Sequence, residues 1–199
     1  MDNQIEKASI YAIEKHSNQK RKDGTLYIFH PFEVVTIAST MTNDEEVLAA
    51  AVLHDTVEDA NVKIEEIEKI FGERIAKLVE HETEEEYPNL TKEESWIIRK
   101  KNALKKLETV TDINFKIIYL SDKLSNIRSL YRDYNEHGIL AFNTFNVKDI
   151  NVQAWYYYEV LDHLKELEKF EAYKEYKNKI DYIFEKTRGK DNEKNSYSI

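Results

Sequence analysis

Cysteine is absent from the 199 residues of this chain, and turn-forming residues are scarce. Without cysteine, disulfides, cysteine-ligated zinc and thiol nucleophiles are excluded. Only 4 glycines and 2 prolines occur, whereas charged residues make up 34% of the chain. Few helix breakers and many charged residues are typical of helices that expose one face. The composition therefore predicts a mostly helical protein.

Long apolar runs are missing as well. The N-terminal MDNQIEKASI has no apolar stretch of the signal-peptide kind, and no segment has the length and apolar character of a membrane span. The net charge of -9 argues against broad binding to nucleic acid or anionic membranes. We therefore expect a cytoplasmic protein with no nucleic-acid or membrane partner, and the oligomeric state stays open.

Apolar periodicity and capping residues predict where the helices lie. Asp44 and Asp112 are expected N-caps, and Thr91 with Glu94 fits a capping box. TLYIF, at residues 25–29, fits a short extended piece. Helices are predicted over residues 5–19, from residue 30 onward, and over residues 45–53, 62–72, 73–82, 91–107 and 113–134, with one or two more over residues 147–186.

Four ionisable residues stand out because each adjoins an apolar segment: His30, His54, Asp55 and Asp122. Imidazole and carboxylate together suit divalent ions such as Mn, Fe, Co, Zn or Mg. Two of each would leave positions open on an octahedral ion for water and substrate, as a hydrolytic site needs. Taken singly, each residue has a plainer interpretation, because a histidine beside apolar residues is usually a hydrogen-bonded structural group.

The order of these residues and their flanking sequence match a known pattern. RKDGTLYIFHP, AAVLHDTVED, FGERIAKLVEHET and LSDKLSNIRSL resemble the HD superfamily of metal-dependent phosphohydrolases, whose signature is His…His-Asp…Asp. The closer resemblance, over residues 5–135, is to the RelA/SpoT hydrolase domain and the small alarmone hydrolases, with HDTVED as the most specific piece. It implies an all-α HD-domain helical bundle over residues 1–188, and we expect residues 189–199 to form a disordered tail.

The resemblance also implies roles for individual residues. One divalent ion, expected to be Mn²⁺, would have these ligands: His30, His54, Asp55 and Asp122. The catalytic acidic pair would be Glu58 and Asp59. Four residues would bind substrate: Arg21, Lys22, Tyr27 and Asn126. Asn126 follows Asp122 by four residues, so both face one side of a helix.

Other features have plainer interpretations or depart from the pattern. Leu26 and Ala60 stand where family members often have Pro and Thr, but neither is a proposed ligand. Arg128 fits both the family pattern and a structural ion pair. The basic run at residues 99–106 predicts a solvated helix face, and the acidic run at residues 84–86 predicts a solvated loop.

These observations predict a phosphohydrolase that uses metal-activated water to remove the 3′-pyrophosphate of guanosine-3′,5′-bis(diphosphate). Two alternatives stay open. One is an HD phosphohydrolase that acts on another nucleotide, such as NADPH or a nucleoside monophosphate. The other is a non-catalytic nucleotide-binding protein with the same fold.

Overall fold

The computed structural model describes the backbone of residues 3–188 and the side chains of residues 3–185. The α-helices, in chain order, are α1 (Gln4–Lys15), α2 (Phe29–Ala38), α3 (Glu45–Leu53), α4 (Thr56–Asp59), α5 (Ile64–Phe71), α6 (Glu73–Glu82), α7 (Trp96–Thr109), α8 (Ile113–His137), α9 (Ile150–His163) and α10 (Glu171–Arg188). Two 3₁₀ helices are η1 (Gly138–Thr144) and η2 (Lys165–Leu167).

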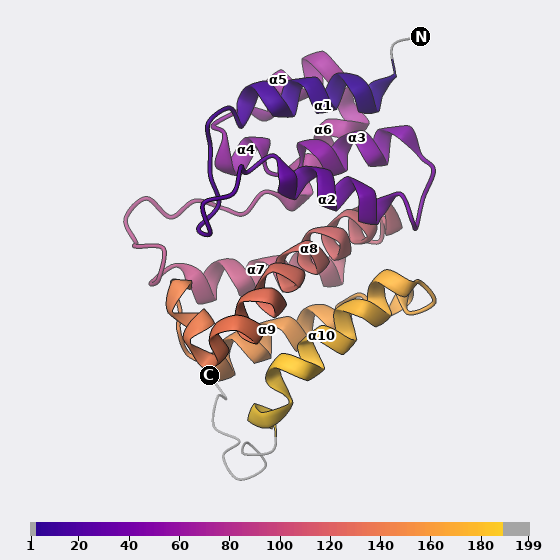
Figure 1. Cartoon of the computed structure of the whole chain (residues 1–199). Helices are drawn as coiled ribbons and strands as arrows, with labels where there is room; N and C mark the ends of the chain where they lie inside the picture. Colours follow the sequence, from indigo (N-terminus) through magenta and orange to yellow (C-terminus); the bar gives the residue numbers. More distant parts are fainter. Residues whose placement is uncertain (1–2, 189–199) are drawn as a thin grey trace.

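Helix α8 is the centre of the molecule. It packs against α2, α3 and α6 on the N-terminal side, and against α10 and η1 on the C-terminal side. Figure 1 shows it crossing between α2 and α10, with α1 and α5 forming the outer layer of the N-terminal half. Buried residues occur along α8 from Phe115 to Leu130. A helix covered on several faces can carry a polar side chain from the core into an internal cavity.

Helix α3 is the second buried element. Every residue from Val47 to Leu53 is buried, because α1, α2 and α6 all pack around it. A helix that is apolar all round belongs in a core. Its N-terminus is capped by Asp44, whose carboxylate accepts from the backbone N–H groups of Glu46 and Val47. Because α3 is fixed in the core, the residues that directly follow it begin at a buried position.

Most local predictions are confirmed. Asp44 and Asp112 are N-caps, and the Thr91–Glu94 capping box forms with reciprocal hydrogen bonds of 2.8 and 3.2 Å. The helix after the box, however, begins only at Trp96, because residues 92–95 form turns. The predicted extended piece makes one isolated antiparallel bridge, between Lys20 and Leu26.

The all-α fold class is confirmed for the described residues, which form helices, turns and that single bridge. Among the described helices, none combines the length and the apolar character that crossing a membrane requires. The predicted tail, residues 189–199, lies outside the described part of the chain. The division into one domain and a tail stays a prediction.

Candidate active site

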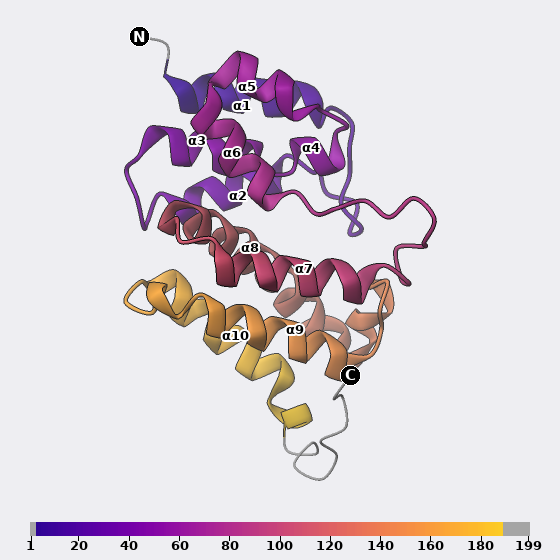
Figure 2. The same cartoon turned by 180° about the vertical axis from the view of Figure 1, so that it is seen from behind.

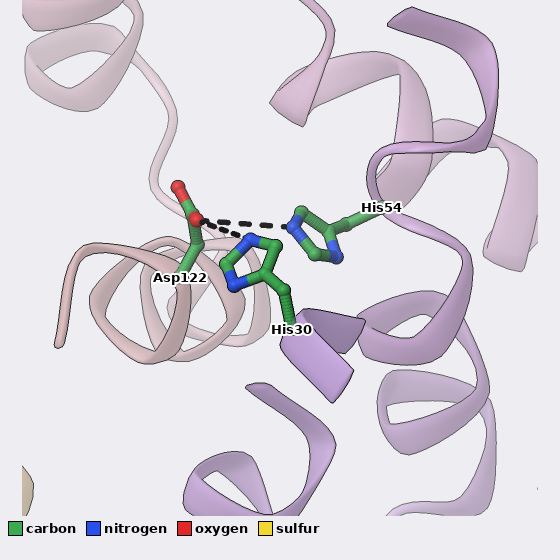
Figure 3. A group of neighbouring side chains, drawn as sticks. All are labelled: His30, His54 and Asp122. Carbon is green, nitrogen blue, oxygen red and sulfur yellow. Dashed lines mark ion pairs between the residues drawn. The ribbon is translucent and has the colours of Figure 1, made fainter. Parts of the chain in front are cut away.

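Three core elements bring the four predicted ligands to one point. His30 is the second residue of α2, and Asp122 lies in the middle of α8. His54 and Asp55 directly follow α3. His30 Nε2 lies 3.1 Å from Asp122 Oδ1 and 3.3 Å from Asp55 Oδ2. The corresponding distances from His54 Nε2 are 3.8 and 3.0 Å. Figure 3 shows His30, His54 and Asp122 converging from their separate elements.

Hydrogen bonds on the far side of each imidazole ring set its tautomer. His54 Nδ1 lies 2.9 Å from the carbonyl oxygen of Ala51, which can only accept, so this nitrogen carries the proton. The hydroxyl of Ser125 donates to Glu33 at 2.8 Å, so it accepts from His30 Nδ1 at 2.9 Å. His54 Nε2 is buried with no hydrogen-bond partner among the described residues. In the neutral rings, both Nε2 lone pairs therefore face the carboxylates.

Arg128 anchors the support behind His30. Its guanidinium donates to Glu33 at 3.1 Å and to Glu175 of α10 at 2.8 and 2.6 Å. Glu33 in turn accepts from Ser125, the partner of His30. Arg128 thus forms the structural ion pair that was one of its two interpretations from the sequence. Through Glu33 and Ser125, it helps to hold the orientation of the His30 ring.

Charge makes this point of the molecule attractive to a cation. Burial alone would lower the pKa of His30, but Asp122 and Asp55 raise it to about 9. Burial opposes ionisation of Asp122, yet Lys123 and His30 hold the pKa of Asp122 below its usual range. One ligand atom from each of His30, His54 and Asp122 lies within 4.8 Å of the others. Two imidazole nitrogens beside carboxylates fit a divalent metal ion.

The acidic pair of α4 lies beside this cluster. The Tyr27 hydroxyl lies 2.6 Å from Asp55 Oδ2 and 2.5 Å from Asp59 Oδ2, so it bridges the two carboxyl groups. Glu58 Oε2 accepts a hydrogen bond of 3.4 Å from the backbone N–H of Glu84. Desolvation by the cavity walls, together with the negative charges of Glu84 and Asp55, raises the pKa of Glu58 to about 7. A carboxyl with a pKa near neutrality can take up and release a proton.

The predicted substrate-binding residues divide into two groups. Three of them, Arg21, Tyr27 and Asn126, line a cavity of about 540 Å³, which His30, Asp55 and Asp122 also line. Arg21 Nη2 donates to Asn126 Oδ1 at 2.9 Å, and Asn126 Nδ2 lies 2.6 Å from Asp122 Oδ1. Lys22 is not among the lining residues, because its Nζ donates to the carbonyl oxygen of Thr144 at 2.5 Å.

The opposite wall of the cavity corrects two predictions. The basic run of α7 does not form a solvated face, because Arg99, Lys100 and Lys106 line the cavity. The acidic run does not form a fully solvated loop, because only 13% of the Glu84 side chain is exposed. Helix α7 packs against α9, and its Arg99, Lys100 and Lys106 face the cavity. The opposite charges of the acidic and basic runs were the one feature of the sequence that could have indicated this pairing.

Two further features had no signal in the sequence. Glu82 lines the cavity, and its Oε1 is buried without a hydrogen-bond partner among the described residues. Desolvation raises the pKa of Glu82 to about 8. Tyr156, from the aromatic cluster at residues 155–158, hydrogen-bonds to the hydroxyl of the lining residue Tyr119 at 2.7 Å. The hydrogen bond from buried Tyr156 helps to hold Tyr119 in place on the cavity wall.

Comparisons with known proteins agree with this geometry. A family model described as HD domain matches residues 8–147. Over 127 residues, the chain is 38% identical to the GTP pyrophosphokinase rsh of Brucella ovis, covering 63% of this chain and 17% of that protein. Over 128 residues, it is 40% identical to the guanosine-3′,5′-bis(diphosphate) 3′-pyrophosphohydrolase of Aquifex aeolicus, covering 64% and 18%. The chain thus spans under a fifth of these two relatives.

A shorter relative and a solved structure match more of their own length. The guanosine-3′,5′-bis(diphosphate) 3′-pyrophosphohydrolase MESH1 of Danio rerio is 38% identical over 127 residues, which cover 61% of this chain and 66% of that protein. A solved structure described as a metazoan ortholog of SpoT that hydrolyzes ppGpp superposes with a TM-score of 0.69 at 28% identity. The match covers 94% of this chain and 97% of that one.

Proposed function

The chain belongs to the HD domain family, and we propose that it removes the 3′-diphosphate of guanosine-3′,5′-bis(diphosphate) by metal-dependent hydrolysis. The observation that carries the proposal is the convergence of His30, His54, Asp55 and Asp122 at one point of a cavity that Glu58 also lines. The activity that gives the Aquifex and Danio relatives their names supports the choice of substrate.

We propose that one divalent ion, Mn²⁺, binds to the four converging residues. Both histidines would use Nε2, because Ala51 and Ser125 occupy the Nδ1 side of the rings. When bound, the ion supplies the Lewis acidity that lowers the pKa of a water molecule. The Nδ1 hydrogen bonds already hold both rings in place, and the Nε2 proton that the raised pKa of His30 favours would be displaced when the ion binds.

Glu58 is proposed as the general base. Its pKa of about 7 lets it be ionised at neutral pH while keeping enough basicity to take a proton from water. Asp59 assists through Tyr27, whose hydroxyl contacts both Asp59 and Asp55 and so fixes their relative positions. The atoms balance: the water oxygen adds to the phosphorus bonded to the ribose 3′ oxygen, and the bond between that phosphorus and the 3′ oxygen breaks. The 3′ oxygen takes the proton that Glu58 returns, and the released pyrophosphate carries the water oxygen.

Arg21, Tyr27 and Asn126 are proposed to hold the substrate. Arg21 can form two parallel hydrogen bonds with a phosphate group, which fixes orientation as well as charge. Its present partner, the Asn126 amide oxygen, is neutral and easily exchanged. A role for Lys22 requires its side chain to leave Thr144, and it stays a prediction. A cytoplasmic location and a part in the stringent response also stay predictions.

The test is a product assay on metal-loaded protein. The panel contains ppGpp, pppGpp, NADPH and nucleoside monophosphates, each with Mn²⁺, with Mg²⁺ and after chelation. We expect pyrophosphate from ppGpp with Mn²⁺ and none after chelation. Release of phosphate from a nucleoside monophosphate, or from NADPH, with no pyrophosphate from ppGpp would overturn the substrate. Full metal loading without turnover of any nucleotide would indicate a binding protein instead.

A further inference from the structure

Glu84 takes part in an unusual ion pair on the cavity wall. Its carboxylate contacts two cations of α7 at once, Arg99 Nη1 at 2.5 Å and Lys100 Nζ at 2.6 Å. Exposure of the three side chains is only 13 to 16%. Burial works against the charge on Glu84, but Lys100, Lys123 and Arg99 hold its pKa below the usual range. An ionised carboxylate therefore occupies a cationic pocket that opens into the cavity.

This ion pair is not needed to fasten the loop to α7. The loop, residues 83–95, runs out from α6 and returns to α7, as Figure 2 shows. Lys106 Nζ already donates to the carbonyl oxygens of His81 and Thr83 at 3.0 Å each. Asn102 already contacts Tyr87 at 2.9 Å. Two anchors thus hold the loop independently of Glu84, which leaves its paired cations available for another anion.

We propose that Arg99 and Lys100 form a binding subsite for a nucleotide diphosphate, and that Glu84 occupies it as an internal competitor which the ligand displaces. A guanidinium and an ammonium converging on two carboxylate oxygens would bind two phosphate oxygens in the same way. A cavity of about 540 Å³ is in the size range of small-molecule pockets, so it can hold a nucleotide.

The identity of the ligand rests on the proposed function. If the 3′-diphosphate is cleaved beside Glu58, the second diphosphate, on the 5′ oxygen, is the group left to fill this subsite. The substrate carries many negative charges into a cavity also lined by Asp55, Glu58 and Asp59. Cations placed on the opposite wall offset that repulsion. Specificity for a nucleotide with diphosphates at both positions follows from having a binding group for each.

The test measures binding, so it does not depend on turnover. Guanosine 5′-diphosphate and guanosine are titrated by calorimetry into the full metal-loaded chain, because only the first has the diphosphate. Arg99→Gln should weaken guanosine 5′-diphosphate binding about tenfold or more, since hydrogen bonds to charged groups are the strong ones. Glu84→Gln should tighten it several-fold. Neither change should affect guanosine. Lys101→Gln, an exposed neighbour on the same helix, is the matched control and should change nothing.

A second measurement uses the wild-type chain alone, so it holds even if a variant fails to fold. Hydrogen exchange in the wild-type loop should quicken near Glu84 when guanosine 5′-diphosphate binds, because the ion pair opens. The subsite would be refuted if Arg99→Gln bound this ligand as tightly as wild type, or if neither wild type nor Glu84→Gln bound it. Unchanged loop exchange on binding would refute the competitor role. A chain that binds through Arg99 yet never cleaves ppGpp would keep the subsite and lose the proposed function.

Discussion

The two walls of the cavity are built from different kinds of sequence. One wall, from α2, α4, α8 and the turn after α3, presents His30, Asp55, Glu58 and Asp122, and His54 lies 3.0 Å from Asp55. Each of these residues could be named from residue type and order. The other wall, from the end of α6 to α7, presents Glu82, Glu84, Arg99 and Lys100, which the sequence did not assign to the site. Metal binding and proton transfer need particular residue types in a particular order, which can be recognised in a sequence. Ion pairs can form between many combinations of positions, so they leave no such pattern.

The walls also differ in how they satisfy charge. In the first, imidazole nitrogens and carboxylates face one another around a point that attracts a cation. In the second, Glu84 already pairs with Arg99 and Lys100 from within the chain. We therefore expect changes in the first wall to affect metal binding and rate, and changes in the second to affect affinity.

The largest effect should come from Asp122. Asp122→Ala should abolish both metal binding and turnover, because its carboxylate is a proposed ligand and also neutralises Lys123. Asp122→Asn keeps the volume and gives a check against misfolding. Metal per chain by mass spectrometry, with circular dichroism for folding, measures the outcome. Asp162→Asn, on the exposed part of α9, is the control. A folded Asp122→Asn protein with full metal content would contradict the assignment.

The next effect should come from Glu58→Gln. The amide cannot take a proton, and a well-placed general base contributes about 10²- to 10⁴-fold to the rate. We expect a loss of that size in kcat with the metal content unchanged, and no loss in Glu65→Gln, an exposed residue of α5. A normal rate in the Glu58 variant would assign the proton transfer to another group.

A smaller effect separates the neighbours Arg21 and Lys22. Arg21→Ala should raise KM for ppGpp about tenfold with kcat less affected, because a charged hydrogen bond is lost from substrate and transition state alike. Lys22→Ala should have little effect, since Lys22 bonds to Thr144 outside the cavity. Steady-state kinetics of both variants are compared. Equal increases in KM would mean that Lys22 turns into the cavity when substrate binds.

The smallest effect should be a shift in the pH profile. Ionised Glu58 should be required, so kcat/KM should rise with pH through a pKa near 7. The negative charge of Glu84 helps to raise that pKa, so Glu84→Gln should favour ionised Glu58 and move the acid limb to lower pH. Profiles for both proteins at saturating Mn²⁺ measure the shift. A limb displaced to higher pH would contradict this coupling.

The sequence predicted most of the helices because their signals are local. Asp44 and Asp112 cap helices where expected, and the apolar run before His54 forms a buried helix. The site residues of the first wall were grouped correctly in space, since order and flanking sequence matched a pattern. The orientations of Lys22, which lies outside the cavity, and of Arg99, which lines it, could not be predicted for a shared reason. Which way an exposed-looking cation turns depends on partners distant in sequence, Thr144 for one and Glu84 for the other.

Steady-state hydrolysis of ppGpp by Glu58→Gln, Arg99→Gln and the double variant tests the division between the walls most directly. The account predicts that Glu58→Gln lowers kcat with KM little changed, and that Arg99→Gln raises KM with kcat retained. The two effects on kcat/KM should then multiply in the double variant, as expected for residues that act independently. If Arg99→Gln lowered kcat as strongly as Glu58→Gln, or if the double variant were no worse than Glu58→Gln alone, the two walls would act as one catalytic unit and the account would be wrong.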